Sequence, residues 1–323
     1  MISDQQNRLP WAYQRDNDMN QHVTTNDLNL TQLVDNLASV RGMTISGRTR
    51  LTPNFRPTTD YPLVIAIHGG TYTSTYFDVP GYSLLDRAAA LGIPAIAIDR
   101  PGYGSSTAFP PAEATVLNNA AILDEMIGEI WTRYGAGARG VVLIGHSIGG
   151  AVTSAIAART PAWPLLGIAT SGCLLSTPTA SHDAWSSLPD VPMIDLDNAT
   201  KDGVMFGPQW TYDPCMPDAS RVSDAPVPRA ELIDIAIRWP DAVRAVLAKV
   251  RVPVHHRQGE YDQLWITNSD QVKAFGAALT ASPNVDAKLL AHAGHCIDFH
   301  RLGSAFQLEQ LAFALRCSVT PGA

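Results

Sequence analysis

A strand-like run that ends in the pentapeptide Gly-His-Ser-Ile-Gly constrains this chain more than any other feature. Residues 141–144, Val-Val-Leu-Ile, are typical of a buried parallel strand, and residues 151–159 are small and compatible with a helix. A G-x-S-x-G sequence between a strand and a helix is typical of a sharp turn that exposes the serine hydroxyl above a sheet. The two glycines allow that turn, because a Cβ there would crowd the neighbouring strand and helix. We therefore predict that Ser147 is a nucleophile.

The rest of the chain repeats the same alternation of apolar runs and helical patterns. Residues 38–51 resemble a hairpin at a sheet edge, with two short extended segments punctuated by Gly42 and Gly47. The predicted buried strands are residues 63–67, 95–98, 141–144, 166–171, 252–258 and 287–291. The predicted helices between and after them are residues 83–91, 112–134, 151–159, 272–279 and 306–316. This alternation predicts an α/β fold with a mostly parallel sheet and helices on both faces.

Two segments interrupt that pattern and suggest the domain organisation. Residues 1–37 read as a polar N-terminal arm. Residues 173–245 contain many prolines, bulky apolar side chains such as Trp185 and Met205, and only short helical stretches such as 229–238. We predict that residues 173–245 form an inserted, mainly helical cap, and that residues 38–172 and 246–323 form the body.

A serine hydroxyl needs a base within hydrogen-bond reach and a third group that orients the base. The order serine, acid, histidine is the one expected for a serine at such a turn, and Asp262 and His295 supply it. Both residues follow predicted strands, so loops at the carboxyl end of the sheet can bring them over Ser147. The rivals of His295 are His292 and His300, and those of Asp262 are Glu260 and Asp234.

Negative charge that develops on an acyl oxygen must meet backbone N–H groups. Ile148 follows the candidate nucleophile at a helix N-terminus and is one predicted donor. Gly70, in the loop after the strand 63–67, is the predicted second donor, with Thr71 as the alternative. The predicted substrate pocket contains four residues: Thr71, His146, Trp210 and Trp265.

Five stretches carry a resemblance to a known family: His68-Gly69-Gly70, residues 99–106 (D-R-P-G-Y-G-S-S), residues 145–150, residues 259–262 and Gly294-His295. From about residue 38 to the C-terminus the chain resembles the α/β-hydrolase fold family. The resemblance implies the α/β-hydrolase fold with a cap. A serine at the turn, where epoxide hydrolases and haloalkane dehalogenases of that family carry aspartate, points to its esterase, lipase and carbon–carbon hydrolase side.

Charge and cysteine content restrict the partners. A net charge of −7 with 16% charged residues argues against nucleic acid or an anionic membrane, which need basic patches. The polar N-terminus has no apolar signal core, so we expect a cytoplasmic protein. The four cysteines have no metal-ligand or disulfide spacing, and we expect no metal and no cofactor. The expected partner is a small-molecule ester, and a homodimer is left open.

The sequence therefore predicts a serine hydrolase that cleaves a carboxylic ester of a small, largely apolar or aromatic substrate through an acyl-enzyme. Two alternatives stay open at this point. The same residues serve carbon–carbon bond hydrolases and acyltransferases, which only the products distinguish. A ligand-binding protein that keeps the pocket without turnover is the non-enzymatic alternative. A further alternative for Arg100 is contact with an anionic group of the substrate.

Overall fold

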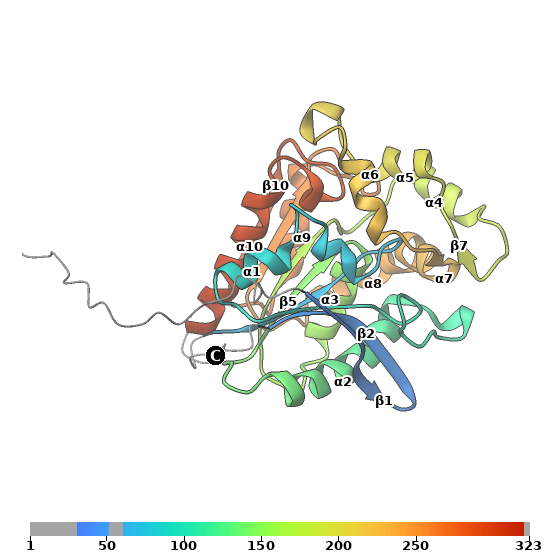
Figure 1. Cartoon of the computed structure of the whole chain (residues 1–323). Helices are drawn as coiled ribbons and strands as arrows, with labels where there is room; N and C mark the ends of the chain where they lie inside the picture. The colour runs from blue at the N-terminus through green and yellow to red at the C-terminus, as the bar shows by residue number, and fades with distance from the viewer. Residues whose placement is uncertain (1–30, 52–60, 320–323) are drawn as a thin grey trace, which may run out of the picture.

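An eight-stranded sheet forms the centre of the computed structural model, which describes residues 31–51 and 61–319. The spatial order of the strands is β1-β2-β4-β3-β5-β6-β9-β10 (Figure 1). Strand β2 pairs antiparallel with β1 and β4, and the other neighbours are parallel. The strands are β1 (Gln32–Val40), β2 (Met43–Arg50), β3 (Leu63–Ile67), β4 (Ala95–Ile98), β5 (Val141–His146), β6 (Leu165–Ser171), β9 (Val254–Gly259) and β10 (Val285–Leu290).

The three central strands β3, β4 and β5 are buried along their whole length. Alternate residues enter separate cores, because successive side chains of a strand point to opposite faces. Ile65 and Ile67 of β3 belong to one apolar cluster, and Val64 and Ala66 belong to the other. Burial on both faces explains why these strands read in the sequence as continuous apolar runs rather than as alternating patterns.

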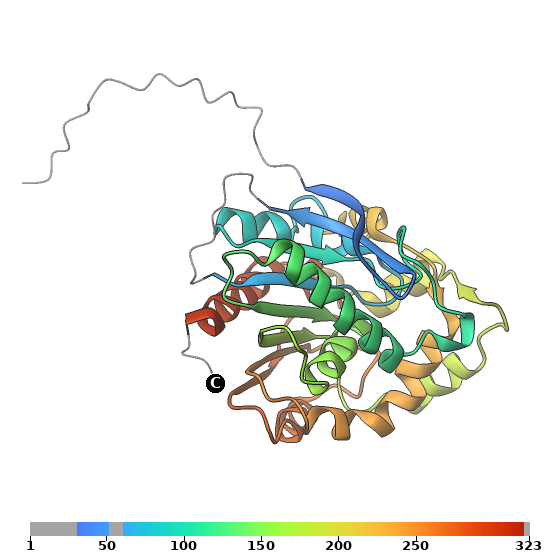
Figure 2. The same ribbon diagram turned by 90° about the horizontal axis from the view of Figure 1, so that it is seen from below.

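Helices cover both faces of the sheet, as the alternation predicted. The cluster that contains Ile65 also includes residues of α2 (Val116–Tyr134), α3 (Ile148–Ala158) and α9 (Ser269–Ala278). The cluster that contains Val64 includes residues of α1 (Leu84–Ala90) and α10 (Gly303–Val319). Figure 2 shows α2 crossing in front of the sheet. The fold class is therefore confirmed as an α/β fold with a mostly parallel sheet.

The segment between β6 and β9 lies over one end of the sheet, where its yellow and orange ribbons gather in Figure 1. It is mainly helical. Its elements are α4 (Thr179–Ser186), β7 (Met193–Ile194), α5 (Asn198–Met205), α6 (Met216–Ser220), β8 (Val227–Pro228), α7 (Arg229–Ile233), a π-helical turn (Asp234–Arg238) and α8 (Trp239–Leu247). Helix α8 buries Trp239, Val243 and Leu247 in the same core as α3, so it runs past the expected cap boundary at residue 245 and packs on the body.

The beginning of the described chain differs from the sequence expectation. Strand β1 starts at Gln32, so residues 32–37 of the expected polar arm belong to the sheet. Gly47 lies within β2, where a Cβ would overlap the backbone of β4, and does not separate two segments. Residues 1–30 of the expected arm lie outside the described residues. Across residues 31–51 and 61–319 no helix is long and apolar enough to cross a membrane.

Candidate active site

Ser147 occupies the tight turn between β5 and α3. Its backbone has φ 56° and ψ −124°, a conformation that a residue with a side chain adopts rarely and that is found at functional sites. Its N–H donates to the Ser171 carbonyl at 2.8 Å. A Cβ on Gly145 would overlap the Thr153 hydroxyl, and one on Gly149 would overlap the Ile67 carbonyl. The turn therefore needs both glycines of the pentapeptide.

The three predicted catalytic side chains come together at this turn. The Ser147 hydroxyl lies 2.8 Å from Nε2 of His295, and Nδ1 of His295 lies 2.7 Å from a carboxylate oxygen of Asp262. Asp262 follows β9 and His295 follows β10, so neighbouring strands place them. The Asp262 carboxylate also accepts hydrogen bonds from the Gln258 side chain at 2.6 Å and from the Leu264 N–H at 3.0 Å. These bonds hold the carboxylate toward the imidazole, which can then accept the serine proton at Nε2.

The rival histidines are engaged elsewhere. Nε2 of His300 accepts the Gly294 N–H at 2.9 Å, and its Nδ1 donates to a backbone carbonyl at 2.8 Å. Burial lowers the pKa of His300 to about 4, which keeps it neutral in this backbone-bridging role. His292 packs edge-on against the exposed ring of Trp210. Only His295 therefore reaches Ser147 among these three.

The rival acids also have other partners. The Glu260 carboxylate accepts the N–H of His292 at 3.0 Å. Asp234 accepts the N–H of Val116 at 2.8 Å and so holds the start of α2. Asp262 is the carboxylate that contacts His295.

The loop after β3 passes directly beside the candidate nucleophile. A Cβ on Gly69 would approach the Ser147 Cβ to 2.8 Å, so only glycine allows the backbone to lie this close. Gly70 and Ile148 both line the cavity next to Ser147. Ile148 is the first residue of α3, where backbone N–H groups have no acceptor within the helix. The two predicted oxyanion donors therefore lie next to each other in the wall of the same cavity.

Thr71, the alternative donor, has an unusual environment. Its φ is 62°, a left-handed conformation that is strained for a β-branched residue. Its carbonyl accepts hydrogen bonds from Nζ of Lys201 at 2.9 Å and from the Ala225 N–H at 3.0 Å, which tie it to the 173–245 segment. Its buried hydroxyl has no hydrogen-bond partner among the residues that the structure describes. Thr71 thus combines a strained backbone with an unsatisfied hydroxyl in the wall of the cavity that Ser147 also lines.

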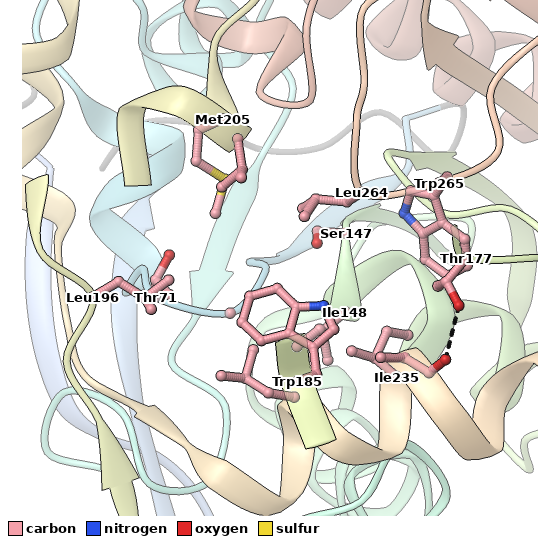
Figure 3. A pocket seen from close by; sticks show the side chains of 14 residues that line it. Thr71, Ser147, Ile148, Thr177, Trp185, Leu196, Met205, Ile235, Leu264 and Trp265 are labelled. Atoms are coloured by element: carbon pink, nitrogen blue, oxygen red, sulfur yellow. Dashed lines mark hydrogen bonds between the residues drawn. The ribbon is translucent and has the colours of Figure 1, made fainter. Parts of the chain in front are cut away.

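A small apolar cavity opens beside Ser147, with a volume of about 50 Å³. Figure 3 shows Ser147 within a ring of side chains, with Met205 above it and Trp185 below it. The body contributes Gly70, Thr71, Ser147, Ile148, Leu264 and Trp265, and the segment after β6 contributes Thr177, Trp185, Leu196, Val204, Met205, Leu232, Ile235 and Ala236. The Trp265 ring is fixed by a hydrogen bond from its Nε1 to the Gly172 carbonyl at 2.8 Å.

Two of the four predicted pocket residues line this cavity, and two do not. Thr71 and Trp265 lie in its wall. Trp210 is 57% exposed, lies edge-on to the ring of Tyr261 and does not line the cavity, so its assignment to the pocket was wrong. His146 was also wrongly assigned, because it is buried beneath the candidate triad with its ring centroid 4.9 Å from that of His295. Burial, and then the charge of His295, keep the pKa of His146 well below its usual value.

The sequence did not single out which residues of the segment after β6 line the cavity. Trp185 and Met205 stood out only as bulky side chains in a proline-rich segment, whereas Leu196, Leu232 and Ile235 resemble ordinary core residues. Their position depends on how short helices dock over the sheet, which no local sequence pattern encodes. Within the described residues, no group of three His, Cys, Asp or Glu side chains is placed to hold a metal ion.

The strand order, the tight turn at Ser147 and the loops of Asp262 and His295 together define an α/β fold with these three side chains at the carboxyl end of its parallel strands. The chain belongs to the alpha/beta hydrolase family, whose sequence pattern matches residues 64–303. A comparison with curated protein sequences finds no match.

Solved structures share this fold at low sequence identity. A thermophilic esterase from Thermogutta terrifontis is similar with a TM-score of 0.63 and 18% identity, over 90% of this chain and 100% of that chain. A monoacylglycerol lipase from Paleococcus ferrophilus gives a TM-score of 0.59 and 17% identity, over 85% and 99% of the two chains. E-2-(acetamidomethylene)succinate hydrolase also gives 0.59 and 17%, over 89% and 99%. Identities this low show the fold alone.

Proposed function

We propose that this protein is a serine hydrolase that cleaves a carboxylic ester of a small, largely apolar or aromatic substrate. The observation that carries the proposal is the continuous hydrogen-bonded chain from the Ser147 hydroxyl through His295 to Asp262, with spacings of 2.8 and 2.7 Å. This chain ends at the wall of an apolar cavity, where an acyl group can lie against the serine.

The reaction proceeds in two stages. His295 accepts the Ser147 proton at Nε2 while the serine oxygen attacks the ester carbonyl carbon, and Asp262 stabilises the imidazolium through Nδ1. The N–H groups of Gly70 and Ile148 stabilise the oxyanion. His295 then gives its proton to the departing alcohol, which leaves Ser147 acylated. A water molecule repeats the sequence with His295 as base, releases the acid and restores the serine.

The cavity supports a short acyl group. The cavity volume is about 50 Å³. Since one water molecule needs roughly 10–15 Å³ of such volume, the cavity has room for only a few groups of that size. The walls are apolar and include the rings of Trp185 and Trp265, which favour aliphatic or aromatic groups over charged ones. The proposed substrate therefore places a small acyl chain between these two rings.

Membership of the alpha/beta hydrolase family supports a hydrolase in general terms. The neighbours include an esterase and a monoacylglycerol lipase, and at these identities they contribute only the shared fold. The experiment must therefore distinguish ester hydrolysis from three alternatives: carbon–carbon cleavage by the same residues, acyl transfer by the same residues, and ligand binding without turnover.

The test combines covalent labelling with turnover. Intact-mass spectrometry after exposure to a fluorophosphonate is expected to show one adduct in the natural protein and in Ser154→Ala, a control serine on α3, and none in Ser147→Ala. A panel of p-nitrophenyl esters is expected to show highest kcat/KM for acetate or butyrate. Labelling without ester turnover would favour carbon–carbon cleavage or acyl transfer. The absence of labelling and turnover in the folded natural protein would overturn the proposal.

A further inference from the structure

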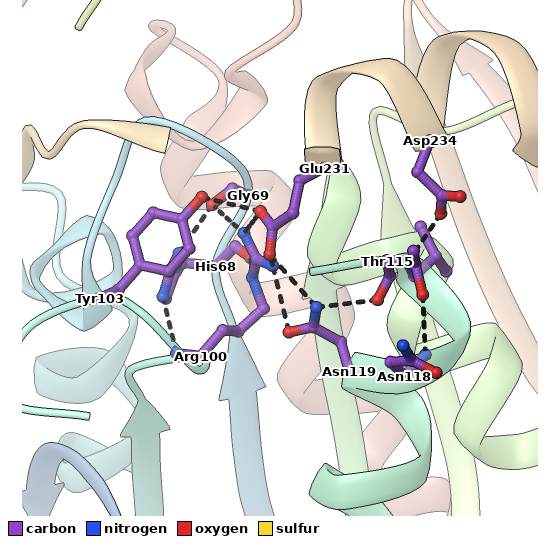
Figure 4. Close-up of polar contacts among 10 residues, drawn as sticks. His68, Gly69, Arg100, Tyr103, Thr115, Asn118, Asn119, Glu231 and Asp234 are labelled. Carbon is purple, nitrogen blue, oxygen red and sulfur yellow. Dashed lines mark hydrogen bonds and ion pairs between the residues drawn. The ribbon is translucent and has the colours of Figure 1, made fainter. Parts of the chain in front are cut away.

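A fully buried ion pair connects the covering segment to the loop that carries Gly70. Arg100 follows β4, Glu231 lies in α7, and both side chains have no exposed area. The guanidinium donates two parallel hydrogen bonds to the Glu231 carboxylate, at 2.6 and 3.0 Å. Figure 4 shows the guanidinium between Glu231 and the loop at Gly69. This arrangement contradicts the alternative that Arg100 contacts an anionic substrate.

The remaining donors of Arg100 reach the loop after β3. Nε donates to the His68 carbonyl at 2.9 Å, and Nη2 donates to the Gly69 carbonyl at 3.0 Å. Nη1 also approaches the Asn119 side-chain oxygen at 3.5 Å. An arginine side chain has five N–H groups in a fixed fork, and each of them has an acceptor here. The guanidinium thus holds two consecutive carbonyls of this loop in one orientation.

The second of these carbonyls sets the direction of a predicted oxyanion donor. The Gly69 carbonyl and the Gly70 N–H belong to one planar trans peptide unit, in which the two groups point in opposite directions. A Gly69 carbonyl that faces Arg100 therefore turns the Gly70 N–H away from Arg100. Gly70 lines the cavity beside Ser147. A hydrogen bond from a cation to a peptide carbonyl also polarises that peptide and makes its N–H a better donor.

His68 reinforces the same orientation. Its Nδ1 lies 2.7 Å from the Gly69 carbonyl, and its Nε2 accepts the Arg100 N–H at 3.1 Å. Because Nε2 is an acceptor, Nδ1 carries the proton and donates to the carbonyl. Burial, and then the charge of Arg100, keep the pKa of His68 well below its usual value, so this tautomer is neutral. The Gly69 carbonyl therefore has two donors.

Glu231 is needed because an unpaired guanidinium in this position would be very unfavourable. An ion transferred from water to a protein interior without a partner is strongly destabilised, because it loses its hydration. The Glu231 carboxylate is itself completed by the Tyr103 hydroxyl at 2.8 Å and the Asn119 side-chain amide at 3.2 Å. Arg100 and Glu231 therefore have all of these hydrogen-bond partners only when α7 is docked on the body.

We propose that Arg100 and Glu231 are positioning residues that orient the Gly69–Gly70 peptide for oxyanion binding, and that α7 completes the oxyanion hole by supplying the Glu231 carboxylate. The proposal rests on the proposed function. It makes docking of the covering segment a requirement for catalysis as well as for substrate enclosure.

The first test separates orientation from stability. Arg100→Lys and Glu231→Gln are expected to lower kcat by at least tenfold, and by no more than the roughly 10²–10³-fold lost with one oxyanion donor, while KM changes little. Arg257→Lys is the matched control, because Arg257 is also buried and forms carboxylate pairs, with Asp286 and Glu309. This control is expected to lose stability but to keep kcat.

The second test uses an apolar replacement of the pair. Buried ion pairs replaced by apolar residues of similar size often retain stability. The double variant Arg100→Met/Glu231→Leu is therefore expected to recover the Tm that either single change loses, yet to keep the low kcat. A double variant that recovers both Tm and kcat would show that the pair is structural and would overturn the proposal.

The third test distinguishes this inference from the proposed function. A trifluoromethyl ketone that forms a hemiketal with Ser147 is expected to bind Arg100→Lys at least tenfold more weakly than the natural protein, and the matching methyl ketone is expected to bind both equally. The amide resonance of Gly70 in glycine-labelled protein is expected to shift in Arg100→Lys and Glu231→Gln but not in Arg257→Lys. Failure of ester hydrolysis in the natural protein would overturn the proposed function, whereas an unshifted Gly70 resonance would overturn the positioning role.

Discussion

The ring of Tyr76 lies flat against the imidazole of His146, with centroids 4.7 Å apart and an angle of 5° between the planes. His146 directly precedes Ser147 in the sequence, yet this stacking turns its side chain into the core and away from the cavity. His146 therefore packs beneath the candidate triad and does not line the cavity.

The catalytic assignment predicts a graded loss of activity. Ser147→Ala is expected to lower kcat by about 10⁶-fold, since loss of the nucleophile in such a triad has that effect. Asp262→Asn is expected to lower kcat by about 10⁴-fold, because the amide favours the wrong tautomer of His295. Ester hydrolysis with circular dichroism as a check of folding measures both. A folded Ser147→Ala protein with normal turnover would contradict the assignment.

The cavity wall predicts which tryptophans control acyl length. Trp185→Ala removes a wall of the cavity and is expected to move the preferred p-nitrophenyl ester from short toward longer acyl chains. Trp210→Ala removes an exposed ring outside the cavity and is expected to leave the chain-length profile unchanged. The ratio of kcat/KM for octanoate to that for acetate is the measurement. An equal change in both variants would show that the cavity is not the acyl site.

The unsatisfied hydroxyl of Thr71 predicts a trade between stability and activity. Thr71→Val keeps the side-chain shape and removes a buried hydroxyl that has no hydrogen-bond partner in the described chain. The free energy of unfolding is therefore expected to increase by about 1 kcal/mol. We propose that this hydroxyl donates a hydrogen bond to bound substrate, so the same change is expected to lower kcat/KM about tenfold, the effect of losing roughly 1.4 kcal/mol. Urea denaturation and ester kinetics report the two effects. Thr71→Ser, which retains the hydroxyl, is expected to retain the activity.

Buried histidines predict a decline of stability in mild acid. Burial lowers the pKa of His256 to about 3 and that of His255 to about 4, whereas both are near 6.5 in an unfolded chain. As the pH falls from 6.5 to 4, the unfolded state binds protons that the folded state does not, so the free energy of unfolding decreases by up to about 1.4 kcal/mol per pH unit for each histidine.

Denaturation curves recorded between pH 7 and 4 measure that slope. His256→Asn is expected to reduce it by up to the contribution of one histidine, because asparagine does not titrate in this range. A slope that is the same in the variant and the natural protein would contradict a neutral buried His256.

The central sheet and the candidate catalytic residues could be predicted from local sequence patterns. Residues 63–67 and 95–98 were predicted as strands with the bounds that the structure has, because continuous apolar runs flanked by turn residues have few other solutions. Ser147, Asp262 and His295 could be selected because each lies in the loop or turn that follows a strand of one parallel sheet, and such strand ends meet at one edge.

The parts that were missed depend on contacts distant in sequence. Residues 32–37 of strand β1 were predicted as part of the polar arm, whereas residues 38–40 were predicted as extended. In the structure four of these six residues are exposed, because β1 is an edge strand with only one neighbour, so they lack the apolar run of a buried strand. The buried ion pair of Arg100 was not found because its partner Glu231 lies 131 residues further along the chain, and the predicted helical stretch 229–238 did not indicate what it packs against. Trp210 was assigned to the pocket on its size alone, and size does not determine which way a side chain faces.

The loop after β9 carries both the acid Asp262 and the cavity wall Trp265, and the Trp265 ring is anchored to Gly172 next to the imidazole of His295. A substitution that reshapes this wall therefore also disturbs the proton-accepting machinery. Most other wall residues come from the segment after β6, and in the described chain these residues form no hydrogen bond with Ser147, His295 or Asp262. Substitutions in that segment can thus change the shape of the cavity without altering the hydrogen bonds of the triad. Substitutions in the loop of Asp262 and Trp265 affect both at once.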